Sequence, residues 1–148
     1  MAGTPNPAEP ASGRAPRPTA APPILVVEDD TALARLMEAL LTSAGHTVRT
    51  VADGESAVTA VRDARPALVL LDLTIPKLDG WQVLERLRAG GDAPPVVLFT
   101  GDHSASRRAH QAGVAAAILK PFDVDELLAT VERLLATPAD GDEEATRS

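Results

Sequence analysis

The sequence contains no cysteine and no tyrosine, and aromatic residues make up only 2% of it. Without cysteine the chain can form no disulfide, no thiolate metal site and no cysteine nucleophile. The aromatic residues are Trp81, Phe99 and Phe122. Because hydrophobic residues still reach 45%, we expect a core built from leucine, valine, isoleucine and alanine.

Dense clusters of basic residues are also absent, and the formal net charge is −7. Nucleic acids and anionic membrane surfaces are bound through clustered lysine and arginine, so direct binding to either is disfavoured. No apolar run approaches the ~18 residues of a membrane span. The N-terminus lacks the basic region and apolar stretch of a secretory signal. The sequence therefore favours a cytoplasmic protein.

The length of 148 residues is typical of one domain, and composition divides the chain into three parts. Residues 1–22 are rich in proline, alanine, glycine, serine and threonine, which predicts a disordered arm. Residues 138–148 predict a short acidic tail. Its acidic side chains are Asp140, Asp142, Glu143 and Glu144. The folded domain is predicted over residues 23–137.

Within this domain, apolar runs alternate five times with amphipathic stretches. The apolar runs are 24–27, 46–51, 67–71, 96–99 and 114–119. The clearest helical face repeats at i, i+3, i+4, i+7 and i+8. It consists of Leu33, Leu36, Met37, Leu40 and Leu41. A similar face begins at Val124, whereas the stretch 102–112 has only alanines on its apolar side. The stretch 102–112 therefore has the least support as a helix.

Alternating strands and helices predict an α/β fold, a doubly wound parallel sheet of five strands with five helices on its two faces. Inner strands of such a sheet are apolar throughout, as the first, third and fourth runs are. The second run alternates polar and apolar residues and the fifth is rich in alanine, as edge strands would be. The predicted order is 2-1-3-4-5, as in flavodoxin-like folds, with the ligand crevice beyond the C-terminal strand ends.

Polar side chains follow the predicted strands at that edge. In strand order they are Glu28, Asp29 and Asp30, then Asp72, then Thr100, then Lys120. Crowded carboxylates repel one another unless a cation joins them, and oxygen ligands suit Mg²⁺. A hydroxyl and an ammonium opposite them suit a phosphoryl oxygen. The set fits a carboxylate that accepts a phosphoryl group as a mixed anhydride.

Four segments resemble the receiver domain of bacterial two-component response regulators. They are ILVVEDD, LVLLDLTIPKLDG, VVLFTG and ILKPF. The resemblance implies Mg²⁺-dependent phosphorylation of Asp72 by a sensor histidine kinase or a phosphotransfer protein. It implies a signalling switch rather than an enzyme, one that slowly removes its own phosphoryl group. Because no output domain follows the last predicted helix, we expect a single-domain regulator, similar to chemotaxis regulators, that acts on a downstream protein.

The resemblance also implies a set of metal ligands. Glu28, Asp29 and Asp72 would hold Mg²⁺ together with the backbone carbonyl of Thr74. Asp30 is instead predicted to cap the following helix, which is the common role of an aspartate in that position.

On the other side of the acceptor, the resemblance implies that Thr100 turns inward to the phosphoryl oxygen and that Lys120 pairs with it. The peptide bond between Lys120 and Pro121 would be cis, a rare form outside such places. The chain has 12 arginines and only two lysines, Lys77 and Lys120. Lysine therefore stands where a compact point charge is wanted.

Two positions depart from the family pattern. Many receivers have tyrosine or phenylalanine three residues before the lysine, and here that residue is Ala117. The aromatic ring that moves inward with the threonine on activation is therefore missing. Gly101 stands where alanine is common, which we expect to leave the site open.

Two other functions compete with the phosphoacceptor hypothesis. A phosphohydrolase of the haloacid dehalogenase type needs a second aspartate two residues after the nucleophile, where this chain has Thr74. A receiver-like interaction module that works without phosphorylation is the stronger alternative, because Ala117 removes the usual aromatic. The histidines, His46, His103 and His110, are predicted to be surface residues rather than phosphorelay sites.

Overall fold

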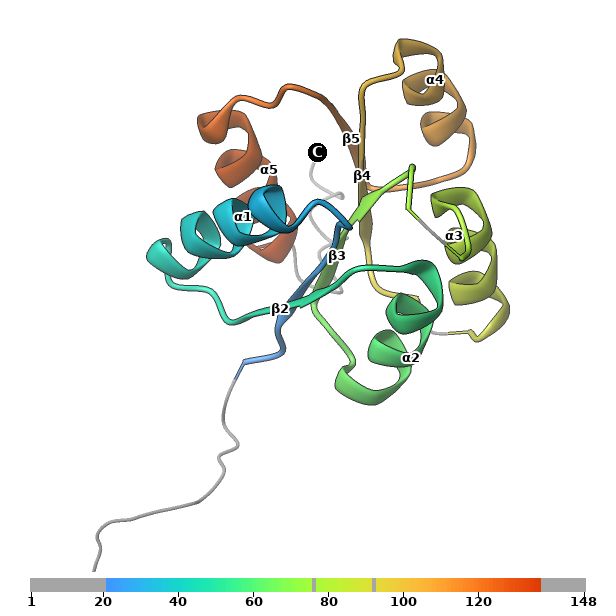
Figure 1. Cartoon of the computed structure of the whole chain (residues 1–148), viewed down its shortest axis with the longest axis horizontal. Helices are drawn as coiled ribbons and strands as arrows, with labels where there is room; N and C mark the ends of the chain where they lie inside the picture. The colour runs from blue at the N-terminus through green and yellow to red at the C-terminus, as the bar shows by residue number, and fades with distance from the viewer. Residues whose placement is uncertain (1–20, 76, 92, 137–148) are drawn as a thin grey trace, which may run out of the picture.

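The computed structural model describes residues 21–75, 77–91 and 93–136. Within them strands and helices alternate strictly (Figure 1). The strands are β1 (Ile24–Val27), β2 (Val48–Val51), β3 (Leu68–Asp72), β4 (Val96–Thr100) and β5 (Ala116–Leu119). The helices are α1 (Thr31–Ser43), α2 (Gly54–Ala64), α3 (Gly80–Ala89), α4 (His103–Gln111) and α5 (Val124–Ala136). All neighbouring strands are parallel and their order is β2-β1-β3-β4-β5, so the predicted fold is confirmed.

Helices cover both faces of the sheet, with α1 and α5 on one side and α2, α3 and α4 on the other (Figure 1). Side chains of the inner strands alternate between two cores. Leu25 and Leu71 point to the core under α2, α3 and α4. Val26, Leu70 and Phe99 point to the core under α1 and α5. Since both faces are covered, every residue of β1, β3 and β4 is buried.

The sheet edges carry the less buried strands, as predicted from the alternation in the second run and the alanines in the fifth. In β2, Arg49 and Thr50 are exposed, and only the flanking valines are half-buried. In β5, Ile118 alone is buried. These strands pair on one side only, with β1 and β4 respectively.

The first four helices begin with an aspartate whose side chain accepts a backbone N–H of the first turn. These N-caps are Asp30, Asp53, Asp79 and Asp102. An N-cap satisfies a backbone donor that has no partner inside the helix. The prediction that Asp30 caps α1 is confirmed, because its carboxylate accepts the N–H of Leu33 at 3.1 Å.

Some details of the sequence prediction are wrong. The strand predicted from residue 46 begins at Val48, and the strand predicted from residue 114 begins at Ala116. Leu36 is 47% exposed and Val124 is 39% exposed, although the periodicity places both on apolar helix faces. In α1 the buried stripe consists of Ala34, Met37 and Leu41. The small Ala34 is buried there, whereas the larger Leu36 faces solvent.

One histidine is not the surface residue that its polar neighbours predict. The His46 side chain is only 16% exposed, and its Nε2 lies 2.9 Å from Oε2 of Glu132 in α5. This contact joins the α1–β2 connection to the last helix. His103 and His110 are exposed as predicted.

The predicted arm lies outside the described residues except for Ala21 and Pro22, and the predicted acidic tail lies outside them entirely. Across the described ranges, every helix is too short or too polar to cross a membrane.

Candidate phosphoacceptor site

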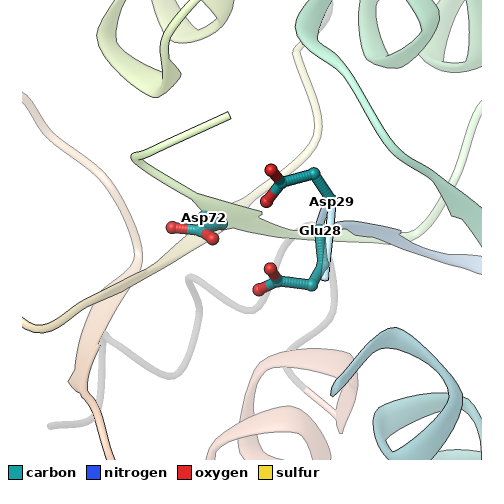
Figure 2. A group of neighbouring side chains, drawn as sticks. All are labelled: Glu28, Asp29 and Asp72. Atoms are coloured by element: carbon teal, nitrogen blue, oxygen red, sulfur yellow. The ribbon is translucent and has the colours of Figure 1, made fainter. Parts of the chain in front are cut away.

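Three carboxylates meet at the C-terminal edge of the sheet. Glu28 and Asp29 directly follow β1, and Asp72 is the last residue of β3. The two strands are hydrogen-bonded neighbours with Val27 opposite Leu71, which brings their ends together. Figure 2 shows the side chains of Glu28 and Asp29 extending toward the side on which Asp72 lies. One oxygen from each residue lies within 4.8 Å of the other two.

Burial makes this cluster electrostatically costly. Glu28 and Asp72 are each only 3% exposed, whereas Asp29 is open to solvent. Burial and the nearby Asp72 carboxylate raise the pKa of Glu28 from 4.5 to about 7. The backbone N–H of Asp30 donates to Glu28 Oε2 at 3.1 Å and opposes part of this effect. Buried like charges favour protonation unless a cation neutralises them, so these residues fit a divalent ion.

Lys120 supplies the only ammonium that contacts the cluster within the described residues. Its Nζ lies 3.1 Å from Asp72 Oδ2 and 3.5 Å from Glu28 Oε1. Burial lowers the pKa of Lys120, but the bonds to these two carboxylates outweigh that effect and the net change is upward. The residue directly follows β5, its N–H donates to the Thr100 carbonyl at 2.8 Å, and the Lys120–Pro121 peptide is cis.

Thr100 ends β4 and is 6% exposed. Its hydroxyl Oγ1 accepts a hydrogen bond from the backbone N–H of Asp102 at 3.0 Å. In this structure the hydroxyl is therefore bonded within its own loop. Next to it, a Cβ added to Gly101 would meet no atom within 4 Å. An alanine would therefore also find room at this position, so the structure gives no sign that the glycine is what keeps the site open.

The loop after Asp72 is held close to the Asp72 side chain. The Thr74 N–H donates to Asp72 Oδ1 at 3.0 Å, which leaves Asp72 with one oxygen on this amide and the other on Lys120. The loop returns at the start of α3, where the Gly80 N–H donates to the Leu73 carbonyl at 3.0 Å. A Cβ at Gly80 would lie 2.7 Å from Leu73 Cα, so glycine is needed for this approach.

A second tight approach lies beneath this loop and could not be predicted from the sequence. A Cβ on Gly54, the first residue of α2, would come within 2.5 Å of Leu78 Cβ and 2.9 Å of Val83 Cγ2. The Lys77 ammonium lies 3.8 Å from Asp53 Oδ2 and joins the same two segments. The glycine at the start of the helix is the only sequence signal of this contact.

The structure therefore gathers most of the predicted site residues. Glu28, Asp29, Asp72 and Lys120 form one cluster, with the Thr74 amide bonded to it. Ala117 lies in β5, three residues before the lysine, and is half-buried against the core under α2, α3 and α4.

Comparison with known proteins agrees with this geometry. The family model described as the response regulator receiver domain matches residues 24–132. The chain therefore belongs to the response regulator receiver domain family, the phosphoacceptor signalling domains of two-component systems.

Curated relatives are longer than this chain. It is 38% identical over 122 residues to response regulator MprA of Mycolicibacterium vanbaalenii, covering 80% of this chain and 53% of that protein. It is 40% identical over 113 residues to transcriptional regulatory protein TcrA of Mycobacterium tuberculosis, covering 75% of this chain and 45% of the relative. The chain thus spans about half the length of the curated relatives it matches.

Solved receiver domains share the fold. A putative response regulator from Chloroflexus aurantiacus is 32% identical, with a TM-score of 0.74 over 78% of this chain and 98% of the other. The receiver domain of the sensor histidine kinase PA1611 from Pseudomonas aeruginosa is also 32% identical, with a TM-score of 0.72 over 78% and 98%. That structure has magnesium coordinated in its active-site cleft.

Proposed function

We propose that this protein is a phosphoacceptor switch in which Asp72 takes a phosphoryl group from a histidine kinase or a phosphotransfer protein. The observation that carries the proposal is the position of Asp72. Its carboxylate is buried at the end of β3, beside two further carboxylates and 3.1 Å from the Lys120 ammonium. A buried carboxylate that contacts an ammonium and lies beside further oxygen ligands for a divalent cation is prepared for nucleophilic work once that cation is bound.

In the proposed reaction an Asp72 oxygen attacks the phosphorus of a phosphohistidine. A P–O bond forms, the P–N bond breaks, and the histidine nitrogen leaves with the electron pair. Glu28, Asp29 and Asp72 would hold Mg²⁺, with the Thr74 carbonyl as a further ligand. Bound Mg²⁺ would supply positive charge at the phosphoryl oxygens.

Lys120 and Thr100 are assigned to the phosphoryl oxygens. The Lys120 ammonium already bridges Asp72 and Glu28, so it can pass to an oxygen of the new phosphoryl group with little movement. The Thr100 hydroxyl would exchange its bond with the Asp102 N–H for one to the phosphoryl group. Slow self-dephosphorylation would follow from water that reaches the open space beside Gly101.

The signal would pass to a downstream protein, and the proposed location is the cytoplasm. We also propose that this domain itself binds no nucleic acid. The formal net charge of −7 supports this proposal, because a surface that binds nucleic acid carries an excess of lysine and arginine.

Ala117 supports one alternative, a receiver-like interaction module that works without phosphorylation. The two functions differ in a simple assay. Treatment with acetyl phosphate and Mg²⁺, followed by Phos-tag electrophoresis, should give a shifted band in the wild type and none in Asp72→Asn. Circular dichroism of the variant should remain that of a folded α/β protein. An unshifted wild type would favour the interaction module. An equal shift in Asp72→Asn would show that another residue is the acceptor.

A further inference from the structure

A second feature of the molecule lies at the opposite edge of the sheet from Asp72. It is a groove of about 320 Å³ between the C-terminal ends of α2 and α3. Its lining includes Pro66, which precedes β3, and Pro94, which precedes β4. The groove and the phosphoacceptor site lie at opposite ends of β3. The first and last residues of this strand are about 13 Å apart.

The floor of the groove is apolar and its rim is cationic. The floor contains Val61 and Leu87, and Leu87 is 5% exposed. The rim contains three exposed arginines, Arg62 and Arg65 from the α2 side and Arg86 from α3. Because the arginines stand on both walls, an apolar group on the floor would have a guanidinium on each side.

These arginines have no acidic partners in the part of the chain that the structure describes. None of the ion pairs found there involves Arg62, Arg65 or Arg86. In a chain with a formal charge of −7, three arginines that have no acidic partner among the described residues surround an apolar floor and form a local site of opposite sign.

Arg65 adds a backbone observation. It is the C-cap of α2 and has φ +47°, in the left-handed region. Glycine is the residue usually found at such a helix end, because it adopts this conformation without strain. An arginine there carries a conformational penalty. Such a penalty is consistent with a role for the Arg65 side chain in binding at the groove.

We propose that this α2–α3 groove docks an acidic peptide segment of a partner protein, with one aliphatic side chain flanked by carboxylates. Guanidinium groups match carboxylates in a planar, bidentate geometry. Val58, Val61 and Leu87 match the aliphatic side chain. Docking leaves the edge that carries Asp72 uncovered. The proposal goes beyond the phosphoacceptor function and does not depend on it, so binding is expected with or without phosphorylation.

The test is an NMR titration of the full ¹⁵N-labelled chain. The probe is an acetylated and amidated peptide, Glu-Glu-Leu-Glu-Glu-Leu-Glu-Glu. Saturable shifts at or below about 1 mM peptide should centre on residues 58–66 and 86–94. The same peptide with alanine at both leucine positions should bind several-fold more weakly. Absence of saturation, or shifts spread over the whole surface, would overturn the proposal.

Matched variants separate the groove from general charge. Arg62→Ala/Arg65→Ala/Arg86→Ala should weaken binding about tenfold, since each exposed pair contributes a small factor. Arg35→Ala/Arg49→Ala/Arg107→Ala removes the same charge from exposed positions elsewhere and should change binding less than about twofold. Equal losses in the two variants would show that only net charge matters.

Two further arms distinguish other occupants. Inorganic phosphate that shifts the same residues as strongly as the peptide would reassign the groove to a small anion. The acidic residues of this chain beyond the described range, Asp140, Asp142, Glu143 and Glu144, could compete. If their replacement by the corresponding amides strengthens peptide binding, the occupant is this chain's own acidic segment rather than a partner.

Discussion

The guanidinium of Arg108 lies over the ring of Trp81, with Cζ 4.1 Å from the ring centroid. Trp81 is the second residue of α3 and follows the loop that begins at Asp72, while Arg108 is in α4, which follows the loop after Thr100. The pair therefore connects the two helices that begin beside the candidate phosphoacceptor site. The buried side of α4 provides little else, because only Ala105 and Ala109 are buried among the described side chains of that helix.

We expect Arg108→Ala to loosen α4. A cation–π contact at an exposed site contributes about 0.5–1 kcal/mol, and the unfolding free energy should fall by that amount. Amide exchange over His103–Gln111 should accelerate and the emission of Trp81, the single tryptophan, should shift to the red. Arg107→Ala removes the same charge one residue away and should leave emission and exchange nearly unchanged. Similar effects of both substitutions would exclude a specific role for the ring contact.

The pKa of Glu28, raised from 4.5 to about 7 by burial and by Asp72, predicts a pH dependence of the metal-free protein. The folded state binds this proton more tightly than the unfolded state. The resulting stabilisation is complete below pH 4.5 and is lost as the pH rises to about 7. Asp53 and Asp102 have a lowered pKa, so their contributions to stability are lost only when the pH falls below 3.8.

Melting temperatures measured in EDTA should therefore fall between pH 4.5 and pH 7. Glu28→Gln should flatten this part of the profile, because the neutral side chain has no proton to lose. Glu38→Gln, at an exposed position of α1, is the control and should keep the wild-type slope. A steep decline that persists in Glu28→Gln would assign the effect to another group.

Mg²⁺ should stabilise the wild type by mass action. At a concentration 100 times its dissociation constant the gain is roughly 2.7 kcal/mol, which corresponds to a rise of several degrees in melting temperature. Asp29→Asn and Glu28→Gln each remove a charged ligand and should reduce the rise. Sodium chloride at equal ionic strength controls for screening. Equal rises in all three proteins would contradict a metal site at these residues.

Ala117 predicts how far the effect of phosphorylation extends. A methyl group cannot fill the space that an inward aromatic ring would occupy. The burial free energy by which such a ring shifts the equilibrium toward the activated state is therefore almost absent. On forming the beryllofluoride complex, chemical shifts should change most at residues 72–80 and 100–106 and fade near Ala117 and along α5. Large changes spread evenly over residues 115–129 would show that the signal is transmitted without the aromatic.

Gly54 predicts that the packing under the acceptor loop is intolerant of added volume. A Cβ there would lie 2.5 Å from Leu78 Cβ, so Gly54→Ala must displace the loop that follows Asp72. Overpacking of this kind costs about 1–3 kcal/mol, and denaturant titration should show that loss. Gly90→Ala is the control, since its Cβ would meet nothing closer than 3.5 Å. An unchanged stability of Gly54→Ala would mean that the loop moves freely.

The strand order and the position of the site are predictable because they depend on patterns local in sequence. Fully apolar runs identify strands buried on both faces, and the residue after each run falls at one edge of a parallel sheet. The same reasoning predicts Asp30 as a cap. The prediction for Leu36 is wrong because helical periodicity does not indicate how deeply each side of the apolar stripe is buried.

Contacts between distant segments cannot be predicted in this way. Nothing in the local sequence links His46 to Glu132, or Arg108 to Trp81, because the members of each pair lie on different elements. The raised pKa of Glu28 likewise depends on burial that only the folded chain provides. Sequence identifies which groups meet at the strand ends, and three-dimensional packing determines their charge states.

The parallel sheet also divides the connections of the chain into two sets. Glu28, Asp72, Thr100 and Lys120 all stand where strands end, so their spacing is fixed by the register of the sheet and not by the turns at the other edge. The second set consists of the turns that lead into the strands at the other edge. Gly45, exposed in the turn before β2, lies in one of them. Insertions, deletions or a circular permutation at such turns can therefore accumulate between related proteins while the acceptor geometry stays unchanged.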